Sequence, residues 1–334
     1  MLRIAVSSDS VILNSCHDGM TTPLYARDST CTWKGKGDIT MKDLLHTRAW
    51  EVQESPIDLG YKVVPEWGKL PEGWSLGPVS GVAMDSKNRV YIFHRGSDAP
   101  PLICLDSDGV LLSSHEKLSF GRPHMVICDA DDNIWLADDG SHIVYKLSPD
   151  GEVLFTLGIK DVPGEDGIHF NQPTDIAFGP QGEMYVSDGY GNRRIAKFDA
   201  RGEFLLDWGS EGEEPGQFAL PHGLITDSKG LVYVADRENW RVQIFDPDGK
   251  FVTQWAHVGR IFDLVQGTDG LFYTCDGTTG RVTQVDASGE VLGFFGEPGE
   301  GVGQLSTAHD IDYSPNSDIV VGHLDGRVHK FSRR

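Results

Sequence analysis

One short segment recurs six times along the chain, and this repetition limits the fold more than any other feature of the sequence. The copies begin at residues 90, 134, 184, 232, 272 and 319 and read VYIFHR, IWLADD, MYVSDG, VYVADR, FYTCDG and IVVGHL. Short apolar stretches such as GVAMD, MVICD or GLITD precede them, and most are followed by two further apolar stretches joined by a DG or SG turn. Each repeat therefore predicts four antiparallel strands, and repeats of about 40 to 50 residues of this kind are typical of β-propeller blades.

The repeats predict an all-β fold, a six-bladed β-propeller, over residues 56–334. The sixth repeat ends after its third strand, so we expect YKVVPEW at residues 61–67 to supply the missing outer strand and close the ring. Residues 1–55 would then form an N-terminal extension, and no motif in them indicates a role.

Composition argues against several kinds of partner and compartment. The formal net charge of −21 would repel nucleic acids and anionic membranes, so we expect neither as a partner. The five cysteines are odd in number and include no CxxC pair, which indicates neither a disulfide framework nor a cysteine zinc site. Free thiols suit a reducing compartment, and Asp9 interrupts the first apolar stretch. We therefore expect a cytoplasmic protein rather than a secreted or lipid-anchored one.

The linkers between repeats also resemble one another and end at a position that the repeats share. They read FGRPH at 120–124, FNQPT at 170–174, FALPH at 218–222 and LSTAH at 305–309. The six equivalent positions are Ser80, His124, Thr174, His222, Phe262 and His309. Each stands where an innermost strand begins, and innermost strands line the channel of a propeller, so these side chains should form one ring.

Histidine occupies alternate positions of this ring, at His124, His222 and His309. Three imidazoles around one axis predict a metal site with three nitrogen ligands and an open fourth position for water or substrate. The alternative is that each histidine is a polar channel residue that is hydrogen-bonded to the backbone or to water.

Three further residues near the predicted channel mouth suggest chemistry. Arg95 and Arg237 interrupt an aspartate-rich position of the repeats. A cation beside a metal is unfavourable unless it serves an anion, so the pair indicates a substrate carboxylate or a developing negative charge. Tyr190 lies between two glycines and could act as a general base there. The alternatives are arginines paired with carboxylates and a tyrosine that packs in a turn.

Asp310 directly follows the third histidine of the ring. In a strand its side chain would point away from the channel lumen or toward the interface between inner strands. The carboxylate could orient a metal ligand or could itself bind calcium.

These segments resemble known families at two levels. Residues 75–334 are similar to the NHL-repeat family. The segments FHRG, RPHMV, SDGYGN, LPHGL, ADREN and AHDI, in this order, resemble the more specific family of peptidyl-α-hydroxyglycine α-amidating lyases, also called peptidylamidoglycolate lyases. This resemblance implies a zinc-dependent carbon–nitrogen lyase whose substrate is an N-acyl α-hydroxyglycine, either a small molecule or a peptide. The products would be a primary amide and glyoxylate.

The resemblance also implies roles for individual residues. The zinc ligands would be His124, His222 and His309. Tyr190 would be the base, Arg95 would support it and the transition state, and Arg237 would contact the substrate. Thr307 stands where the family usually has a methionine, so the pocket wall differs there, and Asp139 is a further candidate for the substrate pocket.

A structural calcium is also implied by the resemblance. Its ligands would be the carboxylate of Asp310 and the backbone carbonyls of Val82 and Val126.

Two other functions stay open at this point. A metal-dependent hydrolase or lactonase on a propeller is one, although such sites use Glu, Asn and Asp around calcium, whereas this ring offers histidines. The other is a non-catalytic NHL propeller that binds a protein or glycan and is indifferent to chelators. Iron or cobalt could also occupy a three-histidine site. The substrate could carry an N-acyl group or an N-carbamoyl group, as in ureidoglycolate.

Overall fold

The computed structural model describes residues 57 and 59–333, together with the backbone of five short strands between residues 2 and 39. The chain divides into two compact units, Met1–Glu54 and Ser55–Arg334. In the first unit the strands are β1 (Leu2–Ser7), β2 (Ser10–Ser15), β3 (Leu24–Ala26), β4 (Trp33–Gly35) and β5 (Gly37–Ile39). β1, β2 and β3 form one antiparallel sheet, and β4 pairs with β5. The rest of the predicted N-terminal extension, residues 1–55, lies outside the described residues.

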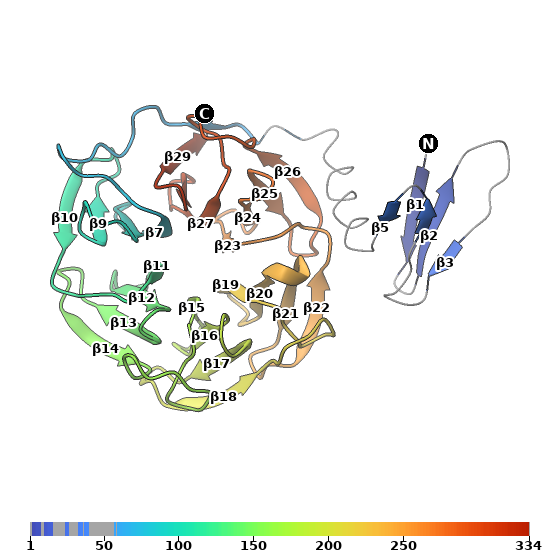
Figure 1. Ribbon diagram of the computed structural model, residues 1–334, viewed down its shortest axis with the longest axis horizontal. Helices are drawn as coiled ribbons and strands as arrows, with labels where there is room; N and C mark the ends of the chain where they lie inside the picture. Colours follow the sequence, from blue (N-terminus) through green and yellow to red (C-terminus); the bar gives the residue numbers. More distant parts are fainter. Residues whose placement is uncertain are drawn as a thin grey trace. The chain divides into compact units, whose positions relative to one another are not determined.

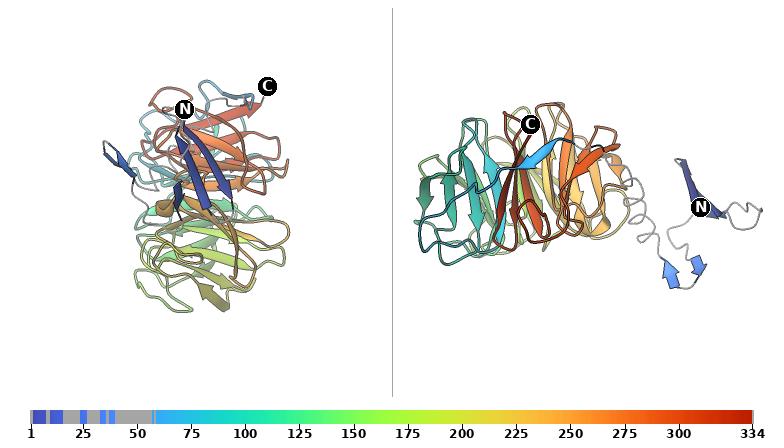
Figure 2. Two further views of the ribbon diagram at one scale, coloured as in Figure 1. Left: turned by 90° about the vertical axis from the view of Figure 1, so that its right-hand side faces the viewer. Right: turned by 90° about the horizontal axis from the view of Figure 1, so that it is seen from above.

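The second unit is a ring of six four-stranded sheets, which confirms the predicted six-bladed propeller (Figure 1). Blade 1 consists of β7 (Val79–Met84), β8 (Val90–His94), β9 (Leu102–Leu105) and β10 (Leu111–His115). Blade 2 consists of β11 (Pro123–Cys128), β12 (Ile134–Asp138), β13 (Ile143–Leu147) and β14 (Val153–Leu157). Blade 3 consists of β15 (Asp175–Phe178), β16 (Met184–Asp188), β17 (Arg194–Phe198) and β18 (Phe204–Trp208). In each blade the first strand lies nearest the axis, and Figure 2 shows the blades from the side.

The remaining three blades follow the same order around the axis. Blade 4 consists of β19 (Pro221–Thr226), β20 (Val232–Asp236), β21 (Arg241–Phe245) and β22 (Phe251–Trp255). Blade 5 consists of β23 (Asp263–Gln266), β24 (Phe272–Asp276), β25 (Arg281–Val285) and β26 (Val291–Phe295). Blade 6 consists of β27 (Ala308–Tyr313), β28 (Ile319–His323), β29 (Val328–Arg333) and β6 (Tyr61–Val63). One short 3₁₀ helix, η2 (Arg237–Asn239), follows β20. No helix in the described part of the chain is long and apolar enough to cross a membrane.

The ring closes through a strand from the start of the propeller sequence, as the sequence predicted. β6 pairs antiparallel with β29, with Val63 opposite Phe331 and Tyr61 opposite Arg333. The last blade therefore combines the two ends of the propeller sequence, and β6 covers the outer edge of β29.

Apolar side chains fill each of the six junctions between neighbouring blades. Trp135 of blade 2, for example, packs in the same buried cluster as Phe170 and Met184 of blade 3. The second strand of every blade is buried along its whole length, because both of its faces meet a neighbouring blade. These strands accordingly read as nearly continuous apolar runs in the sequence.

An aspartate ends the second strand in blades 2 to 5, where it has a structural task. The carboxylate of Asp138 accepts hydrogen bonds from the backbone N–H groups of Gly121 and Arg122 in the preceding linker, at 2.8 and 2.7 Å. Asp188 and Asp236 accept equivalent bonds in blades 3 and 4, at 2.7 and 2.9 Å. These bonds fix the linkers that lead into the innermost strands, so the aspartates position the ring of channel residues.

The closing strand should contribute substantially to the stability of the propeller. Tyr61 is 4% exposed, and its ring stacks on Phe295 with 4.9 Å between the ring centroids. Removal of a buried aromatic side chain usually costs about 3–5 kcal/mol, so we expect Tyr61→Ala to lower the free energy of unfolding by about that amount. Chemical denaturation would measure it. Val252→Ala, at a site that is 50% exposed, is the control and should cost no more than about 0.5 kcal/mol. Equal losses in the two variants would contradict this account of closure.

Candidate metal centre

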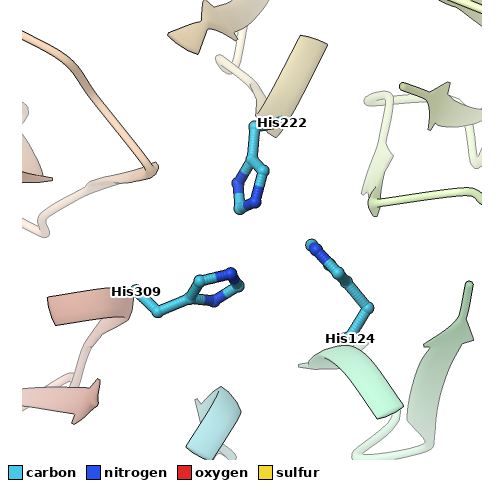
Figure 3. Close-up of side chains that lie close together, drawn as sticks. All are labelled: His124, His222 and His309. Atoms are coloured by element: carbon cyan, nitrogen blue, oxygen red, sulfur yellow. The ribbon is translucent and has the colours of Figure 1, made fainter. Parts of the chain in front are cut away.

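Three histidines from alternate blades point toward one another at the axis of the propeller (Figure 3). His124 lies on β11, His222 on β19 and His309 on β27, and all three are buried. One ligand atom from each histidine lies within 4.8 Å of the other two. The predicted ring is therefore present, and its three histidines meet in one place.

A backbone hydrogen bond sets the orientation of each imidazole. Every Nδ1 lies within bonding distance of the carbonyl oxygen of the next ring residue: Thr174 for His124 at 2.7 Å, Phe262 for His222 at 2.7 Å, and Ser80 for His309 at 2.9 Å. A carbonyl oxygen can only accept, so each Nδ1 carries the hydrogen and each Nε2 keeps its lone pair. A histidine that binds a metal through one ring nitrogen usually donates a hydrogen bond of this kind from its other ring nitrogen.

Electrostatics keep these imidazoles neutral. Burial lowers the pKa of His124 and His222 well below the usual histidine value, and it lowers the pKa of His309 to about 3. Neighbouring imidazoles and arginines act in the same direction. Metal ions bind the neutral form of histidine, so the ligands are in the required state at neutral pH.

Each Nε2 lone pair can accept one hydrogen bond or bind a metal ion. The hydroxyl of Tyr190 lies 3.2 Å from Nε2 of His124 and 3.4 Å from Nε2 of His222. One hydroxyl hydrogen can satisfy only one nitrogen. The residues therefore fit a metal ion better than they fit a set of hydrogen-bonded channel histidines.

The position of Tyr190 depends on the glycines on either side of it. A Cβ atom on Gly189 would lie 1.9 Å from the carbonyl oxygen of Pro221, and one on Gly191 would lie 2.2 Å from the side chain of Asn171. Side chains cannot fit at either position, so the turn packs tightly against the two linkers. The sequence predicted a tight turn that projects the phenol toward the channel mouth, and the structure places the phenol oxygen beside the histidines.

Arg95 and Arg237 lie on different sides of the histidines. Both lower the pKa of His309. Nε of Arg95 donates to the carbonyl of Pro123 at 2.7 Å, whereas its buried Nη2 has no hydrogen-bond partner among the described residues. Nε of Arg237 donates to Glu238 at 3.0 Å, and its guanidinium carbon lies 4.8 Å from the centre of the Phe262 ring. Each arginine is thus anchored at Nε and can offer its terminal nitrogens to an anion.

Arg122 is a site residue that the sequence interpretation missed. Its Nε and Nη2 both donate to the carboxylate of Asp139 at 2.6 Å, and its guanidinium carbon lies 5.1 Å from the centre of the Tyr190 ring. Asp139, which was expected in the substrate pocket, is therefore engaged by Arg122 and fully buried. The one available signal was the place of Arg122 in the linker, two residues before His124.

Thr307, the other residue expected in the pocket, is exposed two residues before the third histidine. Its backbone has a left-handed φ of 64°, and its side chain hydrogen-bonds to Asp325. A left-handed backbone conformation is unusual for a β-branched residue. Here it lies where the linker turns into β27.

A cavity of about 160 Å³ lies between the innermost strands. Asp310, Val82 and Val126, which were expected to bind calcium, all line it. The carboxylate of Asp310 accepts a hydrogen bond from the N–H of Val82 on the next blade at 2.6 Å, and burial raises its pKa. Three further carboxylates, those of Asp175, Asp263 and Asp312, line the same cavity. Asp175 and Asp263 each follow a ring position directly, as Asp310 does, and this shared register could have identified them from the sequence.

Comparison with known proteins gives related lyases and repeat proteins. The NHL-repeat family model matches residues 218–245. A probable peptidyl-alpha-hydroxyglycine alpha-amidating lyase of Caenorhabditis elegans is 32% identical over 247 residues, which cover 64% of this chain and 69% of that protein. Mouse peptidyl-glycine alpha-amidating monooxygenase is 34% identical over 287 residues, or 74% of this chain, but the match spans only 29% of the mouse protein. Human NHL repeat-containing protein 3 is 29% identical, and the match covers 86% of this chain and 83% of the human protein.

Among solved structures, a streptogramin B lyase superposes with a TM-score of 0.60 at 16% identity, covering 82% of this chain and 98% of that one. A virginiamycin B lyase from Staphylococcus aureus gives a TM-score of 0.59 at 11% identity, covering 81% of this chain and 99% of that one. At these identities the two structures share the propeller fold with this chain.

Proposed function

The chain belongs to the peptidyl-α-hydroxyglycine α-amidating lyase family, and on that premise we propose that it is a zinc-dependent lyase acting on N-acyl α-hydroxyglycines. The products would be a primary amide and glyoxylate. One observation carries the proposal: three neutral imidazoles meet at the axis with their Nδ1 atoms bonded to the backbone and their Nε2 atoms free to bind a metal.

Zinc is the metal that we propose for His124, His222 and His309. Three imidazole nitrogens with an open fourth position are a common ligand set of catalytic zinc sites. When bound, zinc would supply a Lewis acid that stabilises negative charge on the hydroxyl oxygen of the substrate. A lactonase-type calcium site would instead need carboxylate and amide oxygens, and this ring provides imidazoles.

Tyr190 is the residue that we assign to proton transfer. Its phenol oxygen lies 3.2 Å from Nε2 of His124, so a substrate hydroxyl at the metal centre would lie within its reach. With its own hydroxyl proton already given up, the phenolate oxygen of Tyr190 would take the hydroxyl proton of the substrate while the carbon–oxygen bond becomes the aldehyde of glyoxylate. The carbon–nitrogen bond then breaks, its electron pair stays on nitrogen, and the same proton returns to that nitrogen to complete the amide. The reaction is thereby balanced without another reactant.

The two arginines would handle the negative charges of this reaction. The bond from Nε to Glu238 holds the guanidinium of Arg237 in place, and we assign its terminal nitrogens to the substrate carboxylate. Arg95 has a buried Nη2 without a partner in the described part of the chain, and we assign it to the charge that develops beside Tyr190.

We also propose a structural calcium ion that binds the carboxylate of Asp310 and the carbonyls of Val82 and Val126. The support is the shared cavity and its buried acidic groups. Burial raises the pKa of Asp310 and Asp263, which means that their charged forms lack compensation in the protein alone. A divalent cation with oxygen ligands would supply it.

His222→Ala should separate the two metals. Removing one of three imidazole ligands leaves a far weaker site, so we expect the zinc content to fall below about half an ion per chain while calcium is retained. Metal analysis of the purified variant would measure both contents. His257→Ala removes an exposed histidine that bonds to Gly289 and should change neither. Undiminished zinc in the His222→Ala, His309→Ala double variant would contradict the shared site.

Tyr190→Phe should leave the fold and the zinc in place but abolish most of the activity. Loss of one hydrogen bond costs about 1 kcal/mol of stability, whereas loss of a positioned base lowers the rate by roughly 10²- to 10⁴-fold. Melting temperature, zinc content and glyoxylate release should be measured together. Tyr185→Phe is the matched control, because the hydroxyl of Tyr185 has no partner among the described residues. A folded, zinc-loaded Tyr190→Phe variant with a rate near that of wild type would rule out Tyr190 as the base.

Arg237→Lys should weaken recognition of the substrate carboxylate. A lysine cannot reproduce a paired hydrogen bond from two terminal nitrogens, so kcat/KM should fall by about 10-fold or more, or roughly 1.4 kcal/mol. Arg201→Lys, at an exposed arginine paired with Asp199, is the control. The assignment fails if an analogue without the carboxylate loses as much kcat/KM as the full substrate.

A further inference from the structure

A groove runs between blades 1 and 2 on the side of the site where Arg95 lies. It has a volume of about 400 Å³. The residues that line it come from the segments after β8 and before β11. We infer that this groove binds the acyl group of the substrate, and that the acyl group is apolar and larger than acetyl; this inference rests on the proposed lyase function.

The inner end of the groove adjoins the metal centre. Arg95 and Arg122 line the groove there. Arg95 bonds through Nε to the carbonyl of Pro123, the residue before His124, at 2.7 Å. Arg122 lies over the ring of Tyr190, with 5.1 Å from its guanidinium carbon to the ring centre. The two arginines that line this end of the groove therefore also contact residues of the candidate metal centre.

The direction of the substrate follows from the arrangement of the blades. Arg237 follows the second strand of blade 4, and Arg95 follows the second strand of blade 1. In a ring of six blades these two lie opposite each other, as Figure 1 shows for β7 and β19. With its carboxylate on Arg237 and its carbinol carbon at the axis, the substrate would extend its acyl group away from blade 4, on the side where blade 1 lies. The groove opens on that side.

The walls of the groove favour an apolar ligand. Ala99, Pro101, Leu118 and Phe120 supply the apolar part of the walls, and serines, a histidine and the two arginines supply the polar part. The ring of Phe120 is held by an edge-to-face contact with Phe93, with 4.8 Å between the ring centroids, so this wall is preformed. Apolar surface of this kind gains free energy when a ligand displaces water from it.

The size of the groove separates the two substrate classes that the sequence left open. A volume of about 400 Å³ falls within the range of small-molecule pockets. A carbamoyl group is too small to fill this space and would leave most of it to water. An acyl group with an aliphatic or aromatic side chain would fill it. The groove therefore favours N-acyl over N-carbamoyl hydroxyglycines.

The test compares binding and turnover for two acyl sizes. N-acetylglycine and N-benzoylglycine, which lack the reacting hydroxyl, would be titrated into the zinc-loaded full chain by calorimetry. Glyoxylate release would be followed from the matching N-acetyl- and N-benzoyl-α-hydroxyglycines. We expect wild type to favour the benzoyl ligand by about 10-fold or more, since a pocket discriminates by that much over a few carbon atoms.

Ala99→Trp would fill the groove and should reduce this benzoyl-to-acetyl ratio by about 10-fold. Ser119→Trp, at an exposed residue of the same groove, repeats the test if Ala99→Trp does not fold. Ile168→Trp is the matched control, because Ile168 is 62% exposed and stands two residues before Phe170, as Leu118 stands before Phe120. It should leave the ratio unchanged.

The outcomes distinguish the groove from the lyase function. A benzoyl-to-acetyl ratio that neither tryptophan in the groove alters would overturn the groove assignment, even if glyoxylate is released. A ratio that falls as expected in the binding measurement, with no glyoxylate from either substrate, would support the groove and overturn the lyase function.

Discussion

The hydrogen bond from each metal-centre imidazole to the neighbouring blade ties the site to the fold. His124 bonds to the carbonyl of blade 3, His222 to that of blade 5 and His309 to that of blade 1. The last of these bonds joins the final blade to the first, across 229 positions of sequence. Without a closed ring, the third imidazole would have no fixed orientation. The short strand β6, which completes the final blade, therefore has a consequence at the axis as well as at the rim.

The side chains around the three histidines carry positive charge, whereas the protein as a whole is negatively charged. The chain carries a formal net charge of −21, yet arginines gather around the three histidines. Arg122 is balanced by Asp139, and Arg260 shares Glu238 with Arg237. Arg95 has no carboxylate bonded to it among the described residues and keeps one buried nitrogen unpaired. A local positive potential in an otherwise acidic molecule would attract a small anion to this mouth and away from the remaining surface.

Much of the fold and part of the site could be predicted from the sequence, because both follow the period of the repeats. The same register that places a strand in each blade places His124, His222 and His309 in one ring. The closing strand was also predictable, since the last repeat visibly lacks one. The Arg122–Asp139 ion pair could not be predicted, because the partner of a long side chain depends on local geometry that the repeats do not share. The aspartates at the blade interface could be predicted in part. The repeats place Asp175 and Asp263 in the same register as Asp310, but whether the three carboxylates meet depends on how the inner strands pack.

The central claim is that the three histidines hold the zinc on which a hydroxyglycine lyase depends. The most direct measurement follows glyoxylate release by the full chain from N-benzoyl-α-hydroxyglycine before chelation, after chelation, and during titration with zinc. The account predicts that activity disappears with the metal and returns in proportion to added zinc, with saturation at about one ion per chain. Full activity in the metal-free protein, or a zinc-saturated protein that releases no glyoxylate, would contradict it.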